Sequence, residues 1–243
     1  VIDPKRQRTF LYYLMEYVDG TTLAEWRASR EDVEIREVTD LIEQIAQGLQ
    51  AFFRREMLHQ DVKPPNILVG REGRVRIVDF GSCWVAGIRE IAAPIERDVA
   101  LGTAQYSAPE TRSGETAGVP SEVFSLATVA YELLTGALPF GDAIEAVQTP
   151  KDFERLSYKP SYEHDPLIPV WLDGALRKAL APRPADRYRE VSELVYDLRH
   201  PNPKLLGRWR PRPHGSQEIG WWKRAVGVLL VLQALTIGLL IFG

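Results

Sequence analysis

The stretch that decides the fold runs from His59 to Gly81. It opens as His59-Gln60-Asp61-Val62-Lys63-Pro64-Pro65-Asn66 and continues as Ile67-Leu68-Val69, a polar turn over residues 70–74, Val75-Arg76-Ile77-Val78 and Asp79-Phe80-Gly81. The two apolar runs are rich in β-branched residues, and the turn between them contains glycine, which predicts a β-hairpin. Because a hairpin brings the start of its first strand beside the end of its second, we expect Asn66 and Asp79 at the same end.

Asp61 and Lys63 precede Asn66 closely, so the same hairpin is expected to gather all four polar side chains in a small volume. Asn66 and Asp79 would supply hard oxygen donors, and Mg²⁺ typically takes one or two protein ligands beside water and phosphate. Asp and Asn are also common at strand ends because they form turns, so each residue alone has a structural explanation. Together they indicate a site for magnesium and phosphate.

The order His-x-Asp-x-Lys-x-x-Asn, followed by Asp-Phe-Gly after a hairpin, resembles the catalytic and metal-binding loops of protein kinases. Further matches follow in the family's order, namely Ala108-Pro109-Glu110, Leu138-Pro139-Phe140-Gly141 and Ala185-Asp186-Arg187. The resemblance covers about residues 1–200 and is to bacterial, eukaryotic-like serine/threonine kinases, with the large lobe and hinge only. The tail and the segment 199–203 are also similar to proteins that fuse a phosphatase to such a kinase.

The resemblance implies transfer of the γ-phosphoryl group of ATP to Ser or Thr hydroxyls of protein substrates. Asp61 would accept or orient the hydroxyl proton, and Lys63 would steady the phosphoryl oxygens. Asn66 and Asp79 would hold Mg²⁺ against the nucleotide. Lys63, together with Thr103 of the later Gly-Thr pair, resembles serine/threonine rather than tyrosine kinases.

Residues 10–18 are aromatic and apolar and end in Asp19-Gly20, which predicts a buried strand followed by a turn. The run from Leu14 to Val18 resembles the strand and hinge that join the two kinase lobes. By that resemblance Met15 would lie at the back of the nucleotide pocket. Glu16 and Val18 would bind adenine through their backbone groups.

Apolar residues recur at helical spacing from Leu41 to Phe53, which predicts an amphipathic helix ending near Arg55. The segment 123–134 is apolar on most sides and predicts a buried helix that Gly136 terminates. The resemblance also implies a buried ion pair between Glu110 and Arg187. We therefore expect an α+β fold: a mainly helical, kinase-like C-terminal lobe with a short β-hairpin, plus one C-terminal transmembrane helix.

The segment 225–242 is apolar and uncharged. At about 1.5 Å per residue it would extend roughly 27 Å, close to the thickness of the hydrocarbon core of a bilayer. Trp221 and Trp222 precede it as interfacial residues, followed by Lys223 and Arg224. The positive charge on the N-terminal side predicts a single-pass membrane protein whose kinase lobe is cytoplasmic.

The predicted organisation has four parts. Residues 1–20 are the end of a small lobe and the hinge, 21–200 the large lobe, 201–224 a basic linker rich in Pro and Arg, and 225–242 the membrane span. A net charge of −3 in 243 residues gives no reason to expect nucleic acid as a partner. The single cysteine, Cys83, cannot form an internal disulfide, which is typical of a reducing compartment.

Two departures from the family pattern bear on activity. Gln60 stands where regulated kinases have an arginine that docks a phosphorylated activation loop. No Ser, Thr or Tyr occurs between Cys83 and Leu101. We therefore predict that activation-loop phosphorylation does not switch this protein; activity that tracks a phosphate on Thr103 or Ser107 would contradict this.

The second departure is that no Gly-rich loop and no strand lysine of the Val-Ala-Ile-Lys type precede the hinge, although the family uses both on ATP. We expect a fragment of a longer kinase, with little activity alone. The alternative is a membrane-anchored pseudokinase that acts as a binding module. A small-molecule phosphotransferase of the antibiotic-modifying kind shares the catalytic Asp and Asn, but Lys63-Pro64, the Ala-Pro-Glu segment and Arg187 count against it.

Overall fold

The computed structural model describes residues 2–3, 8–9, 14–86, 105–147 and 149–206. The chain divides into two compact units, residues 1–207 and 208–243. The predicted membrane span at 225–242 lies outside the described residues. Within the part that is described, no helix combines the length and the apolar composition that a membrane crossing needs.

The described part of the first unit is mainly helical, with short strands, as the sequence predicts. Its helices are α1 (Leu23–Ala28), α2 (Ile35–Phe53), α3 (Pro109–Arg112), α4 (Val119–Thr135), α5 (Pro150–Phe153), α6 (Val170–Ala179) and α7 (Val191–Arg199). Its strands are β1 (Ile2–Asp3), β2 (Arg8–Thr9), β3 (Gly20–Thr22), β4 (Met57–Leu58), β5 (Ile67–Gly70), β6 (Val75–Ile77) and β7 (Trp84–Val85). Short 3-10 turns, including Pro64–Asn66, Phe80–Ser82, Pro184–Asp186 and Pro203–Leu205, connect them.

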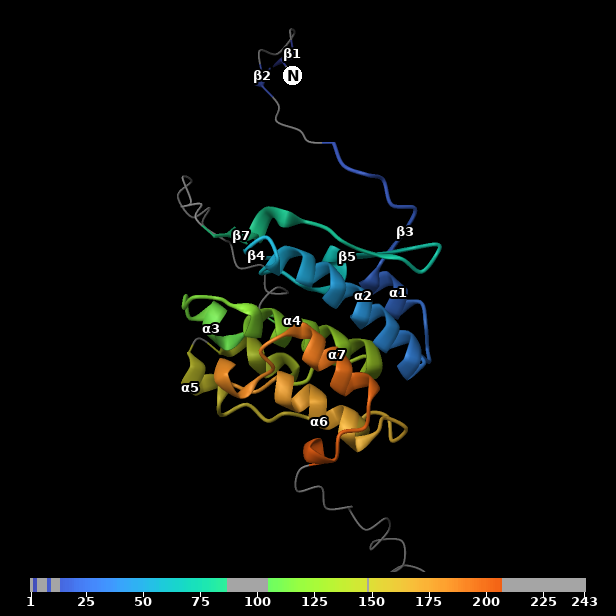
Figure 1. The fold of residues 1–243 in the computed structure, drawn as a ribbon, viewed down its shortest axis with the longest axis vertical. Coiled ribbons are helices and arrows are strands. Elements are labelled where there is room, and N and C mark those ends of the chain that lie inside the picture. The colour runs from blue at the N-terminus through green and yellow to red at the C-terminus, as the bar shows by residue number, and fades with distance from the viewer. Residues whose placement is uncertain (1, 4–7, 10–13, 87–104, 148, 207–243) are drawn as a thin grey trace, which may run out of the picture. The chain divides into compact units, whose positions relative to one another are not determined.

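Four helices pack around the core: α4 and α7 contact each other, and each contacts both α2 and α6 (Figure 1). Both helices that the apolar spacing predicts are confirmed, although α2 begins at Ile35, six residues before the first apolar residue of the predicted pattern. Twelve residues of α4 are buried, so this helix lies inside the domain rather than on its surface. Gly136 ends it in the left-handed region at φ 69°, where a side chain would be strained.

The predicted hairpin is confirmed. Strands β5 and β6 pair antiparallel, with Ile67 opposite Ile77 and Val69 opposite Val75. Gln44 of α2 fastens the turn of the hairpin, because its Nε2 donates to the Gly73 carbonyl at 3.1 Å and its Oε1 accepts from the Val75 amide at 3.1 Å. The hairpin is therefore tied to α2 by a side chain of that helix.

A third strand, β3, pairs antiparallel with β5 and places Gly20 opposite Gly70. A Cβ atom at Gly20 would lie 2.1 Å from the Val69 carbonyl oxygen, so only glycine permits this close approach of the two backbones. Residue 20 thus begins a strand, whereas the sequence pattern predicts a turn there.

The prediction of a buried strand before Gly20 is wrong for its described residues, 14–18, which are neither a strand nor buried. Leu14 is 92% exposed and Tyr17 is 85% exposed. Apolar composition predicts burial only where another surface covers the segment, and no described element does so here. Residues 10–13 lie outside the described part.

The folded unit continues past residue 200, where we place the end of the large lobe from sequence. The 3-10 turn Pro203–Leu205 contacts α6, and a Cβ atom at Gly174 would lie 2.1 Å from the Leu205 carbonyl oxygen. The start of the predicted linker thus packs against the folded unit, and the predicted domain boundaries stay a prediction.

Candidate active site

The loop from His59 to Asn66 is anchored by the buried ring of His59. Its Nε2 lies 3.3 Å from the Val78 carbonyl, and its Nδ1 lies 3.3 Å from the Asp61 amide nitrogen. Because the Asp61 amide can only donate, Nδ1 accepts, and Nε2 carries the hydrogen and donates to the Val78 carbonyl oxygen. Burial lowers the pKa of His59, which favours this neutral form. The ring therefore joins the loop to the far strand of the hairpin.

Three of the predicted site residues make direct contacts with one another. Lys63 Nζ lies 2.9 Å from Asp61 Oδ2. Asn66 Nδ2 donates to the same Oδ2 at 2.8 Å and to the Asp61 carbonyl at 3.0 Å. The Asp61 side chain is 11% exposed and the Lys63 side chain 19%, so the charges are sheltered but still reach solvent. Lys63 and Asn66 therefore both bind Asp61 Oδ2, and Asp61 Oδ1 can bind a further partner.

Asn66 and Asp79 lie at the same end of the hairpin, as the sequence predicts. The Val78 amide donates to the Asn66 carbonyl at 2.9 Å, so Asp79 follows directly after the residue that faces Asn66. Asp79 adopts φ 66° and ψ 77°, and its Oδ1 accepts from the Gly81 amide at 3.2 Å. This left-handed residue turns the chain sharply out of the strand.

These donors fit Mg²⁺ better than a transition metal. Asn66 donates from its amide nitrogen to Asp61, so its amide oxygen is available to bind a metal. Asp79 adds a carboxylate. The described residues contain no group of three or more His, Cys, Asp or Glu that could hold a metal. A site with one amide and one carboxylate oxygen suits an ion that keeps water and phosphate as its other ligands.

Glu122, in the first turn of α4, is a residue of this site that we do not predict from sequence. Gln60 adopts φ 64°, and its amide donates to Glu122 Oε1 at 2.7 Å. Burial raises the pKa of Glu122 to about 7, and the nearby Asp61 carboxylate adds to the shift, although the backbone of Gln60 and His59 opposes it. The available signal is an acid in the first turn of a helix whose residues are mostly buried.

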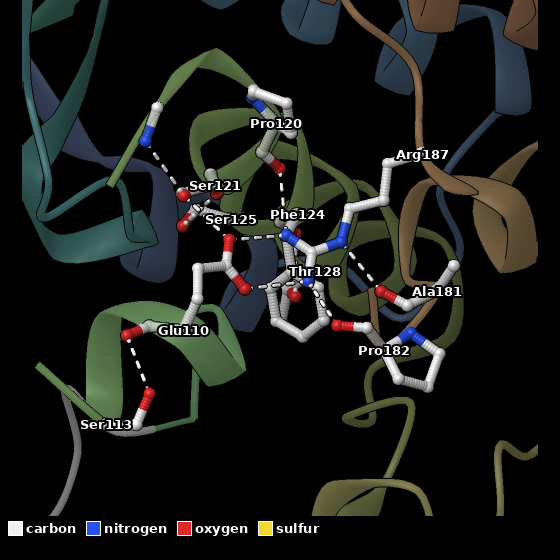
Figure 2. A network of polar contacts seen from close by, with 11 residues as sticks. Glu110, Ser113, Pro120, Ser121, Phe124, Ser125, Thr128, Ala181, Pro182 and Arg187 are labelled. Atoms are coloured by element: carbon white, nitrogen blue, oxygen red, sulfur yellow. Dashed lines mark hydrogen bonds and ion pairs between the residues drawn. The ribbon is translucent and has the colours of Figure 1, made fainter. Parts of the chain in front are cut away.

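The predicted ion pair between Glu110 and Arg187 is confirmed, and Figure 2 shows its surroundings. Arg187 donates from both terminal nitrogens to Glu110, at 2.7 and 2.9 Å, and its side chain is 0% exposed. Its remaining donors reach the carbonyls of Pro120, Ala181 and Pro182. Although burial raises the pKa of Glu110, Arg187 lowers it further, so the pKa lies below the ordinary value.

The three residues predicted to bind the nucleotide base lie before β3. Met15 is 67% exposed, Glu16 is exposed and Val18 is half-buried. The structure places them outside the cluster of contacts around Asp61, so their role stays a prediction.

Comparison with known proteins identifies the class to which this fold and site belong. The model of the protein kinase domain matches residues 1–204, and the chain belongs to this family.

The relatives are bacterial serine/threonine kinases. The chain is 36% identical over 189 residues to serine/threonine-protein kinase PknB of Mycolicibacterium smegmatis, a match that covers 77% of this chain and 30% of the relative. It is 34% identical over 189 residues to PknB of Mycobacterium tuberculosis, with the same coverage. It is 28% identical over 199 residues to PrkC of Bacillus subtilis, covering 82% of this chain and 30% of the relative. The match therefore spans less than a third of the length of these relatives.

Proposed function

We propose that this chain contains the large lobe of a serine/threonine protein kinase that transfers the γ-phosphoryl group of ATP to protein hydroxyls. The observation that carries the proposal is the direct contact of Asp61 with both Lys63 and Asn66 at the end of the hairpin. Family membership supports it independently. A Gly-rich loop and a strand lysine would have to come from sequence outside these 243 residues.

Asp61 would act on the substrate hydroxyl. Its Oδ2 is held by Lys63 and Asn66, so Oδ1 is the oxygen that would orient the hydroxyl and receive its proton. A fixed carboxylate positions the attacking oxygen, and positioning is the main contribution that a protein makes to a loose phosphoryl-transfer transition state. Lys63 would stabilise the negative charge on the transferred group.

Asn66 and Asp79 would hold Mg²⁺ through their side-chain oxygens. When bound, the ion would neutralise charge on the phosphate oxygens of ATP. Met15, Glu16 and Val18 would line the purine site, as the family resemblance implies. These residue roles are part of the proposed kinase function.

We also propose that residues 225–242 anchor the protein in a membrane with the kinase lobe on the cytoplasmic side, reached through the basic linker. The uncharged apolar run and the basic residues before it support this placement. Protein substrates near the membrane surface would then be the expected partners, and the sequence gives no reason to add nucleic acid.

The test uses the chain extended upstream by its own reading frame. Asp61→Asn should lower kcat for phosphorylation of a general substrate such as myelin basic protein or casein by a factor of roughly 10²–10⁴, the usual worth of a general base. KM for ATP should change little, because Asp61 faces the hydroxyl rather than the nucleotide. The readout is transfer of ³²P from γ-labelled ATP.

The matched control is Asp142→Asn, the same chemical change at an exposed residue of the 3-10 turn Gly141–Ala146. It should leave kcat unchanged. Equal activity of the Asp61 variant and the parent would refute the proposed role of Asp61. An extended protein that binds ATP but transfers no phosphate would favour the alternative, a membrane-anchored pseudokinase that acts as a binding module.

A further inference from the structure

One carboxylate oxygen of Glu122 lacks a hydrogen-bond donor among the described residues. The residue is 2% exposed, and its Oε1 accepts from the Gln60 amide at 2.7 Å. Its Oε2 is buried and has no hydrogen-bond partner among the described residues. A buried acceptor without a donor costs about 1–3 kcal/mol, and native proteins rarely leave one so. A donor for Oε2 is therefore expected.

A small cavity lies beside this carboxylate. It measures about 10 Å³ of space open to the centre of a water molecule. It is lined by Glu122, by five other polar residues and by two alanines: Gln60, Ser107, Thr111, Ser121, Ser125, Ala108 and Ala117. About this much space is needed for one water, and a buried water needs two to four polar partners. The lining supplies them, because four of these residues carry hydroxyl groups. The cavity is therefore of the right size for a single water, and its polar partners lie among the apolar groups of Ala108 and Ala117.

The hydroxyl groups that line the cavity differ in the hydrogen bonds that they can still make. The Ser121 proton is already committed, since the hydroxyl donates to Glu110 Oε1 at 2.7 Å; its oxygen accepts from the Gly118 amide at 3.1 Å (Figure 2). The Ser125 hydroxyl donates to the Ser121 carbonyl at 3.2 Å, so its oxygen can still accept. The Thr111 hydroxyl can donate or accept. A molecule that donates twice and accepts once therefore matches the lining.

We infer that this cavity binds one ordered water that donates to Glu122 Oε2 and to Ser125 and accepts from Thr111. The water would connect helix α3, through Thr111, with the first turns of α4, and Glu122 extends the connection to the loop of Gln60 and Asp61. Its effect would be to hold Glu122 in place, and Glu122 in turn holds the Gln60 amide one residue before Asp61. Glu122 is a positioning residue in this account. The inference does not depend on kinase activity.

The charge state of Glu122 is compatible with this bridge. Burial raises its pKa to about 7, so the carboxyl is partly ionised at neutral pH, and a water can donate to it in either state. Of the groups that face it, Asp61 repels the anion, whereas the backbone amides of His59 and Gln60 stabilise it. The charge of Glu122 also helps to raise the pKa of the Cys83 thiol.

A crystal structure of the full chain at a resolution that shows buried waters tests the inference directly. We expect a single peak within hydrogen-bonding distance of Glu122 Oε2 and of Ser125 Oγ or Thr111 Oγ1. Absence of such a peak, or a direct hydrogen bond from Ser125 to Glu122 in its place, would overturn the inference. Because this measurement uses the unaltered chain, it stands even if the variants below do not fold.

Variants test the proposed partners in solution. Thr111→Val with Ser125→Ala removes two hydroxyls and opens little additional space. It should abolish the water-to-amide cross-relaxation that NMR detects at the Gln60 amide, whereas the matched control Ser192→Ala, on α7, should retain it. Cross-relaxation that is unchanged in the double variant would contradict the assignment of Thr111 and Ser125 as partners of the water.

Discussion

At the scale of a single residue, the Glu122 carboxyl makes stability depend on pH. Burial raises its pKa from an ordinary value of 4.5 to about 7, so the folded chain binds more protons than the unfolded chain between these values. Stability from this group is therefore present below pH 4.5 and is lost as the pH rises through 7. At about 1.4 kcal/mol per pH unit, the change is on the order of 3 kcal/mol.

Replacement by Gln removes this titration. We expect the unfolding free energy of the parent, relative to Glu122→Gln, to fall steadily between pH 5 and pH 8, measured by urea denaturation at a series of pH values. Glu154→Gln, at an exposed residue, should instead run parallel to the parent at every pH. Parallel curves for both variants would show that Glu122 keeps an ordinary pKa.

A second residue-scale prediction concerns the Glu110–Arg187 pair. Arg187→Met should cost about 3–5 kcal/mol of unfolding free energy, because Glu110 would keep a buried charge without its partner. Adding Glu110→Met should then cost less than it does alone, and a urea-unfolding double-mutant cycle measures that coupling. The exposed pair Arg183–Asp186, at 3.0 Å, is the control and should show a coupling of about 0–1 kcal/mol. Additive losses at the buried pair would contradict the prediction.

At the scale of the element, the three-stranded sheet depends on one close backbone approach. Gly20→Ala would place a Cβ atom 2.1 Å from the Val69 carbonyl oxygen, so the β3–β5 pairing must open. We expect a loss of about 1–3 kcal/mol of unfolding free energy, typical of overpacking, measured by urea denaturation. Gly70→Ala is the matched control on the facing residue, where the nearest contact would be an ordinary 3.5 Å. Equal stability of both variants would mean that β3 is not tightly bound to the hairpin.

At the scale of the whole molecule, the proposed anchor can be tested by charge. Leu232→Arg together with Leu235→Arg adds two cations near the centre of the predicted span, at roughly 2.5–3.5 kcal/mol each for insertion. We expect the parent chain in the membrane fraction of carbonate-extracted cells and the double Arg variant in the soluble fraction. Leu232→Ile with Leu235→Ile should behave as the parent. A parent chain that is itself released by carbonate would refute the anchor.

The sequence by itself was sufficient to predict the elements whose determinants are local or regularly spaced. The hairpin after Asn66, the buried helix α4 and the amphipathic helix α2 all follow from alternation, helical spacing and turn residues. The Glu110–Arg187 pair joins residues 77 positions apart, and only the family resemblance made it predictable.

Which surfaces cover which side chains depends on the three-dimensional packing. Leu14, Met15 and Tyr17 are exposed because no described element covers them. Gly20 forms a strand because its backbone pairs with Gly70, 50 residues away. Glu122 meets Gln60 across 62 positions, and no local pattern signals that contact. Sequence periodicity reports which face of an element is apolar, whereas the partner of that face and the bonding of a buried carboxylate are set by distant parts of the chain.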